Sequence, residues 1–248
     1  MHYLLSAFLS VATLGLFSAA LAPSSADISA WWNAATAASG AASGYVASRT
    51  VIRIEELDET GLVTSYEEAV TKLDWTKPVT ETVVVSAVKN GKDVTEDWRK
   101  RYAKMARDQA QAKADGTSGA SGRGGPPGGF DATPFDPKYA RAVTRGEPSA
   151  VGTGIEVPYV IDTEGGPVEG VASFSGLGAA LGAVQRWSKP PVFVSAMSSK
   201  LRYTYQDAAL VVTGMQIEGE ASVLFIKRRF RMSFEFSDWR KSARQQQG

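Results

Sequence analysis

The stretch Ala221 to Phe236, ASVLFIKRRFRMSFEF, alternates apolar and polar side chains over most of its length. The large apolar side chains share one parity and are Leu224, Ile226, Phe230, Met232, Phe234 and Phe236. The charged and polar side chains share the other parity and are Lys227, Arg229, Arg231, Ser233 and Glu235. Because successive side chains of a strand point to opposite faces, this pattern predicts a long strand with one apolar face. A sheet with one solvated face is antiparallel by preference.

Similar β patterns recur between turn signals along the chain. The predicted strands cover residues 45–57, 62–75, 80–89, 155–162, 166–175, 192–206, 208–218 and 221–236, with a short element within 136–145. Asp58-Glu59-Thr60-Gly61 and Asn90-Gly91 are the clearest turn sequences. Residues 176–182 are Gly-rich and are interpreted as a connection. The predicted fold is mainly β: a curved antiparallel sheet, or half-barrel, partly covered by one or two short α-helices.

Two segments have helical features and are the candidates to cover the apolar face. Residues 27–38 begin with Asp27 as a potential cap and carry Trp31 and Trp32. Residues 95–113 place an aromatic and apolar stripe at i, i+4 and i+7, which consists of Trp98, Tyr102 and Met105. These five side chains either form a lid over the apolar face or simply pack against it.

The N-terminus predicts export. The first 26 residues contain no Lys, Arg, Asp or Glu, and residues 3–22 are almost entirely apolar or small. We interpret residues 1–26 as a signal peptide cleaved after Ala26, with cleavage after Ala22 as a second option and an uncleaved membrane anchor as the alternative. The expected location is therefore periplasmic or secreted, or the inner membrane if the segment is an anchor. Residues 27–239 form one predicted domain, with a flexible Gly-rich insertion at 114–130 and a basic polar tail at 240–248.

Composition excludes several classes of function. The chain has no cysteine and one histidine, His2, which lies in the predicted signal peptide. A Ser-His-Asp triad, a cysteine nucleophile and ordinary zinc sites are therefore excluded in the mature chain. No cofactor or metal is expected, because no nucleotide-binding motif or calcium loop is present. With 27 basic and 26 acidic residues, the charge balance gives no reason to expect nucleic acid as a partner.

Several short motifs follow the same order as in a known family. They are Glu59-Thr60-Gly61, the segment Leu73 to Pro78 (LDWTKP), the segment Val85 to Lys92 (VSAVKNGK) and Thr133-Pro134-Phe135. Together with the long hairpin and the N-terminal helix, they resemble the periplasmic lipoprotein-carrier superfamily, which sorts outer-membrane lipoproteins. Lys77 stands where the carriers have arginine, and the Gly-rich insertion has no counterpart. The resemblance implies transport of a lipid or of a lipidated protein in the cell envelope.

The apolar face is the candidate ligand-binding site. Its expected lining residues are Tyr203, Tyr205, Met215, Ile217, Leu224, Ile226, Arg228, Phe230, Phe234 and Lys77. Arg228 has the parity of the apolar side chains and projects inward unless a bulge turns Lys227, Arg228 and Arg229 to solvent. An inward guanidinium needs an acidic partner or an anionic ligand.

Three functions remain open at this point. The first is a carrier that binds an apolar or amphiphilic ligand, such as a lipid or acyl chains, in the concave face. The second is a non-catalytic envelope module with a solid core that docks a protein partner. The third is a carboxylate-dependent hydrolase, although Glu55, Glu56, Glu67, Glu68 and Glu81 are expected on a solvated strand face. The basic tail adds a potential contact with anionic membrane lipids.

Overall fold

The computed structural model describes residues 23–76, 81–114, 132–190, 194–223 and 226–242. The helices are α1 (Ser25–Ala41), η1 (Ala42–Gly44), α2 (Thr95–Ala114) and η2 (Pro137–Tyr139). The strands are β1 (Tyr45–Leu57), β2 (Val63–Asp74), β3 (Glu81–Lys89), β4 (Lys92–Asp93), β5 (Val143–Arg145), β6 (Ser149–Val151), β7 (Gly154–Ile161), β8 (Val168–Ser175), β9 (Ala180–Trp187), β10 (Val194–Gln206), β11 (Ala209–Val223) and β12 (Ile226–Lys241).

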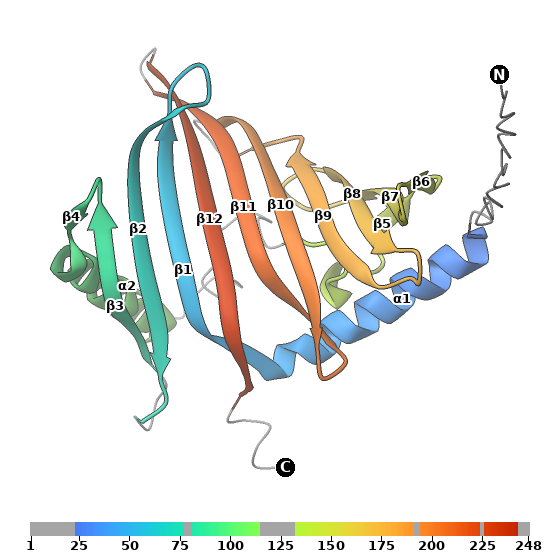
Figure 1. The fold of residues 1–248 in the computed structure, drawn as a ribbon, viewed down its shortest axis with the longest axis horizontal. Helices are drawn as coiled ribbons and strands as arrows, with labels where there is room; N and C mark the ends of the chain where they lie inside the picture. The colour runs from blue at the N-terminus through green and yellow to red at the C-terminus, as the bar shows by residue number, and fades with distance from the viewer. Residues whose placement is uncertain (1–22, 77–80, 115–131, 191–193, 224–225, 243–248) are drawn as a thin grey trace, which may run out of the picture.

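The described strands form one curved antiparallel sheet (Figure 1). Its order is β4-β3-β2-β1-β12-β11-β10-β9-β8-β7-β5, and β6 also pairs with β7. Most neighbours in the sheet are therefore also neighbours in sequence. The exception at the centre is the pair of β1 with β12, which joins Tyr45 to Lys241 and Leu57 to Arg229. The predicted fold class, a curved antiparallel sheet with two helices, is confirmed.

The register of β12 confirms the alternation found in the sequence. Phe234 lies opposite Ile52 of β1 and Met215 of β11, and Met232 lies opposite Ile54 and Ile217. All of these side chains belong to, or pack at the margin of, the two apolar clusters that the helices cover. We call this side of the sheet the inner face and the opposite side the outer face.

The helix α1 covers the half of the inner face formed by β7 to β11. Its first turn is closed by Ser24 and Asp27, because the Asp27 backbone N–H donates to Ser24 Oγ (3.2 Å) and the Asp27 carboxylate accepts from the Ser24 backbone N–H (2.9 Å). Trp32 then enters the core. Trp31 packs over Gly178, where φ is +85° and an added Cβ would lie 2.5 Å from the indole ring. Glycine is thus required at the β8–β9 turn for α1 to lie so close.

The helix α2 packs beside β3 at the other end of the sheet (Figure 1). Trp98 is buried against Ala69, Val84 and Ala87, and Tyr102 packs at the margin of this small cluster. The start of α2 also covers the edge of β3. Thr95 Oγ1 accepts from the Ala87 backbone N–H (2.9 Å), so this donor of the edge strand is not open to another chain.

Several element boundaries differ from the sequence-based prediction. The strand β9 was missed, because residues 176–182 are Gly-rich. Gly182 pairs with Arg202, and an added Cβ there would lie 2.7 Å from the Leu201 carbonyl oxygen, so glycine permits the close pairing of β9 with β10. The strand β12 extends to Lys241, so the tail predicted at 240–248 begins inside a strand.

Some predictions concern residues outside the described part of the chain. They are most of the signal peptide, most of the Gly-rich insertion at 114–130, Lys77, Leu224 and the end of the basic tail. Within the described residues, neither helix combines the length and the apolar character that crossing a bilayer requires.

Candidate functional site

The centre of the inner face carries a strip of apolar side chains between the two helix-covered clusters. We define this central strip as Ile52, Ile54, Phe230, Met232 and Phe234, from the paired strands β1 and β12. All five are only half-buried. The three β12 residues lie at the margin of the α1 cluster, and the two β1 residues lie at the margin of the α2 cluster. The strip is therefore a continuous apolar surface where neither helix completes a core.

The α1 half of the inner face is filled by aromatic side chains. Phe135 is 0% exposed and lies edge-on to Trp32, at 5.0 Å between ring centroids, and to Tyr203, at 5.4 Å. Phe174 adds a further edge contact to Phe135 at 5.6 Å. Edge-to-face geometry at these distances is typical of packed aromatic cores. Tyr203 and Ile217, two predicted ligand-lining residues, therefore belong to this core.

Two buried tyrosines give the α1 half a polar component. The Tyr159 hydroxyl donates to Gln185 Oε1 (2.9 Å), and Gln185 Nε2 donates to the Ala132 carbonyl (2.9 Å). Burial raises the pKa of Tyr159 far above the usual range, with a further contribution from nearby Tyr203. Burial likewise raises the pKa of Tyr203. Both phenols are therefore neutral at physiological pH, and the Tyr159 hydroxyl acts as a hydrogen-bonding group of the core rather than as an acid or base.

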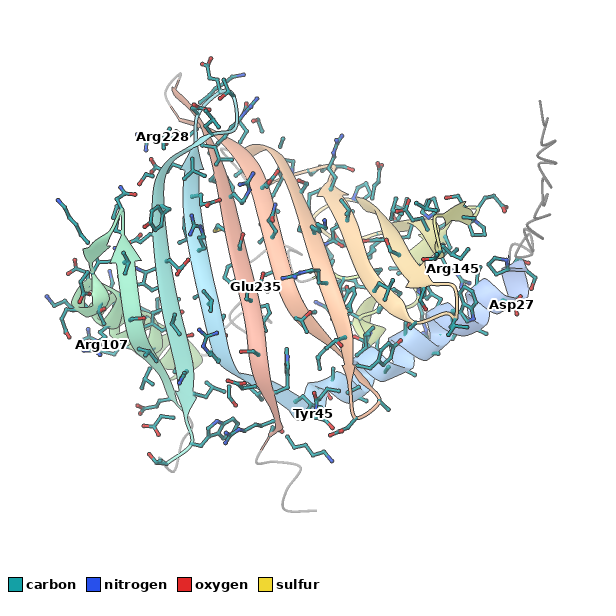
Figure 2. The ribbon with its side chains drawn as sticks, in the orientation of Figure 1. Asp27, Tyr45, Arg107, Arg145, Arg228 and Glu235 are labelled. Atoms are coloured by element: carbon teal, nitrogen blue, oxygen red, sulfur yellow. The ribbon has the colours of Figure 1, made fainter. Side chains whose placement is uncertain are left out.

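Arg228 has inward parity, but its side chain lies in solvent. The register from β11 to β12 is continuous through Ala221 and Arg228, so there is no bulge at this point. The Arg228 side chain is 69% exposed and its Nη1 lies 3.6 Å from Glu56 Oε1. Figure 2 shows it at the end of the sheet, away from both helices. The expectation that Arg228 projects into the interior is wrong, because the strand extends beyond the covered part of the inner face.

The remaining predicted site residues are distributed over the two halves. Met215 packs at the margin of the α1 cluster, whereas Tyr205 is 41% exposed near the β10–β11 turn. The described backbone includes Ile226, whose side chain lies outside the description. Among the lid candidates, Trp32 and Trp98 are buried, Trp31 and Tyr102 are half-buried, and Met105 is 53% exposed. The structure thus brings together Met215, Phe230 and Phe234, and it places Trp31 and Trp32 in the α1 half.

The outer face holds an ion-pair network that the sequence analysis missed. The Glu55 carboxylate lies between Arg53 Nε (2.7 Å) and Arg231 Nη1 (3.2 Å). Arg53 also reaches Glu68, and Arg231 reaches Glu218 at 2.7 Å, so the network spans β2, β1, β12 and β11. Figure 2 looks onto this face, with Glu235 near its centre. The sequence did contain a signal for this network, because strands that pair carry opposite charges at positions that face the same side of the sheet.

Two of the carboxylates expected on a solvated face are shielded. Glu55 lies on the outer face but is 7% exposed, because two guanidinium groups cover it. Glu67 lies on the inner face, where Arg101 of α2 pairs with it at 3.0 Å. Burial acts to raise the pKa of Glu67, but the hydrogen bonds and the charge of Arg101 outweigh it, and the pKa is lowered. The Glu67 carboxylate is therefore held in the ionised form, with Arg101 as its partner.

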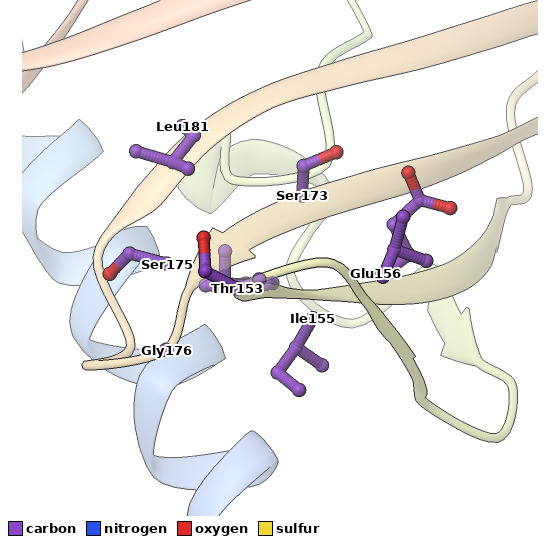
Figure 3. Close-up of a pocket in the computed structure, with 10 residues that line it drawn as sticks. Thr153, Ile155, Glu156, Ser173, Ser175, Gly176 and Leu181 are labelled. Atoms are coloured by element: carbon purple, nitrogen blue, oxygen red, sulfur yellow. The ribbon is translucent and has the colours of Figure 1, made fainter. Parts of the chain in front are cut away.

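Two surface hollows among the described residues lie away from the central strip. One, of about 370 Å³, is lined by residues of β6 to β9, among them Val151, Ile155, Glu156 and Leu181 (Figure 3). A second, of about 560 Å³, lies at the start of α2 and is mostly polar, with Asp93, Thr95 and Asp97 in its lining. Within the described residues, no group of three His, Cys, Asp or Glu side chains is placed to hold a metal ion.

No family model matches the chain, and no curated protein matches it. A solved structure is similar to this chain over most of its length. It is the crystal structure of a DUF1329 family protein from Desulfovibrio piger, at 1.75 Å resolution. The alignment covers 88% of this chain and 94% of that chain, with 11% sequence identity and a TM-score of 0.34. A likeness of this degree carries no argument about function.

Proposed function

We propose that this protein is an exported envelope protein that binds an apolar or amphiphilic ligand, such as a lipid or the acyl chains of a lipidated protein, on the central strip. The supporting observation is the half-burial of Ile52, Ile54, Phe230, Met232 and Phe234 between two separate clusters. A contiguous apolar surface that the fold leaves partly open to solvent is a candidate binding site. Export rests on the apolar N-terminal sequence, and the sequence resemblance to lipoprotein carriers supports the ligand class.

Burial of the strip by an acyl chain provides the driving force. Apolar surface removed from water contributes roughly 25 cal/mol per Å², and methionine adapts its side chain to irregular partners. The α1 cluster does not have to open in this proposal, because Phe135 and Trp32 stay packed. The ligand would lie across β1 and β12, with the two helices on either side.

The proposal is tested first by identifying what the protein carries. The protein is purified from the envelope of its own cells without detergent and weighed intact by native mass spectrometry. We expect an added mass equal to that of a lipid or fatty acid, identified by chromatography of an organic extract. A mass equal to that of the bare chain, combined with no binding of the neutral apolar probe N-phenyl-1-naphthylamine, would overturn the proposal.

A pair of matched variants then locates the site. Met232→Asp places a charge in the central strip, whereas Val184→Asp places one on the outer face at a side chain that is 52% exposed. We expect Met232→Asp to weaken probe binding at least tenfold and Val184→Asp to leave it unchanged. Thermal unfolding of both variants shows whether either change acts through stability. Equal probe binding by the two variants would place the ligand elsewhere.

A second candidate function is a protein-docking module with a solid core. It is favoured by the packed α1 half and by exposed apolar side chains near the β6–β9 hollow, where Val151 and Leu181 are each 51% exposed. In that case the outer face near this hollow is the functional surface. Val184→Asp would then impair partner binding, and Met232→Asp would not.

A further inference from the structure

The helix α2 carries more basic than acidic side chains. The basic side chains that the structure describes divide into two groups. Arg99 and Arg101 have partners within the fold. Arg99 Nη1 lies 2.5 Å from Glu96 and its Nε donates to the Val84 carbonyl (3.3 Å). Arg101 pairs with Glu67 and lies over the Trp98 ring at 5.5 Å. These two arginines therefore fix α2 to β2 and β3.

The second group consists of Lys100, Lys104 and Arg107, which we call the basic stripe. Their spacing of i, i+4 and i+7 places them on one face of the helix. Each is exposed, and no carboxylate among the described residues forms an ion pair with any of them. Like charges at this spacing destabilise a helix slightly. Arg107 Nε donates to the Ala103 carbonyl of its own helix (3.2 Å), so the basic stripe makes no described ion pair or hydrogen bond with the sheet.

The middle of α2, from Ala103 to Asp108, has no cover within the described part of the chain. Every residue from Ala103 to Asp108 is exposed. Met105 continues the stripe of Trp98 and Tyr102, yet its side chain is 53% exposed because the small α2 cluster ends at Tyr102. Figure 2 places Arg107 at the margin of the molecule. Met105 lies on the Trp98 side of the helix, so the basic stripe, on the opposite side, is turned away from the sheet.

We propose that α2 docks the protein, through its basic stripe, on a lipid bilayer that contains anionic phospholipids. Charge complementarity supports this partner, since the basic stripe adds three unpaired positive charges along one helix face. The inference goes beyond ligand binding, because it concerns the surface on which the protein works.

The test is co-sedimentation of the full chain with lipid vesicles. Vesicles of phosphatidylcholine with about 30% phosphatidylglycerol are compared with vesicles of pure phosphatidylcholine. At roughly this density of negative charge, each Lys or Arg near the surface contributes about 1 kcal/mol to binding. We expect binding to the anionic vesicles only, and its loss at about 0.5 M salt because salt screens such contacts. Equal binding to both vesicle types would overturn the proposal.

Charge reversal shows whether α2 is the contact. The variant K100E/K104E/R107E should lose roughly 100-fold or more in vesicle affinity. The matched control R141E/R186E/K200E reverses three exposed cations away from α2 and should bind as the wild type does. Helical circular dichroism should be the same in both variants, because none of these side chains has an ion-pair partner in the described structure.

Two further outcomes keep this inference separate from the proposed function. Both variants should bind N-phenyl-1-naphthylamine in solution as the wild type does, since the central strip is unchanged. Failure of probe binding with vesicle binding intact would refute the ligand site but not the docking surface. If K100E/K104E/R107E binds vesicles as the wild type does, the basic stripe does not face a membrane. The same conclusion follows if this variant loses binding to an acidic protein but still binds vesicles.

Discussion

The two helices cover the same face of one sheet, but they build very different cores. Under α1, aromatic rings from four separate parts of the chain interlock around Phe135, and a buried Tyr159–Gln185 pair adds hydrogen bonds. Under α2, the fully buried side chains are Trp98 and three small residues of β2 and β3. The difference indicates that one half of the sheet maintains the fold and that the other half is held by little more than a tryptophan and two arginines.

Local stability should follow this division. Segments with few buried apolar contacts open more readily than the rest of a structure. We therefore expect α2 and β3 to exchange amide hydrogens well before the strands under α1. The central strip lies at the boundary between the two halves, which is where a ligand could add the contacts that neither helix supplies.

The largest effect is expected from Phe135→Ala. Phe135 is fully buried and touches three other rings, so its truncation leaves a cavity in the aromatic core. A change of this kind costs about 3–5 kcal/mol in the free energy of unfolding. Urea titration followed by tryptophan fluorescence measures the loss. A loss below about 1 kcal/mol would show that the α1 half is not the main source of stability.

Trp98→Ala should act locally. The indole is the main apolar group between α2 and the sheet, and its loss should release α2 at a cost of about 2–3 kcal/mol, near the lower end for a buried aromatic residue. Hydrogen exchange measured by mass spectrometry should show α2 and β3 unprotected while β7 to β11 stay protected. Equal loss of protection in both halves would show that the sheet unfolds as one cooperative unit.

Acid should weaken the α2 half before the α1 half. The pKa of Glu67 is lowered in the folded state, so its bond to Arg101 contributes above the ordinary glutamate pKa and is lost as the pH falls through the folded value. The expected contribution is about 0.5–1 kcal/mol, because Arg101 is half exposed. The hydrogen-exchange rate of the α2 amides, divided by the intrinsic rate of an unfolded chain at the same pH, should therefore rise below about pH 4.3. Glu67→Gln should remove this dependence and show the same loss at pH 7.

The smallest effect is expected from Met105→Ala. This side chain is exposed although it continues the apolar stripe of α2, so its truncation should change the free energy of unfolding by less than about 0.5 kcal/mol. Thermal unfolding beside Trp98→Ala measures the contrast. A loss comparable to that of Trp98→Ala would show that Met105 is buried by a part of the chain not described here.

Alternation and turn chemistry were sufficient to predict most of the fold. The predicted strand at 45–57 coincides with β1, and the helix predicted at 95–113 differs from α2 by one residue at its end. The strand β9 was not predicted because it begins with small residues such as Gly182, where close pairing with β10 leaves no room for a side chain. Its sequence therefore lacks the alternation of apolar and polar residues that indicates a strand. Such constraints come from a partner strand and cannot be read from one segment alone.

The candidate site was harder to predict, because alternation along a strand shows which face of the sheet a side chain is on but not how deeply the side chain is buried. Tyr203, Phe230 and Arg228 all have inward parity, yet the first is buried in the core, the second is half-buried and the third lies in solvent. What separates them is the position of the helices and of Phe135, which arrives from a loop between distant elements. The pattern predicted the face correctly, but the covered part of that face depends on tertiary contacts.

The central pairing of β1 with β12 has a consequence for the order in which the protein can fold. This pairing joins residues about 170–200 positions apart, and contacts of such long range slow folding. Until residues 226–241 have been synthesised, β1 to β3 and β7 to β11 can form only as two separate sheets. The strand β12 therefore joins the two sheets into one, and a chain that ends before Ile226 should expose the unpaired edges of β1 and β11 to proteases and to other chains.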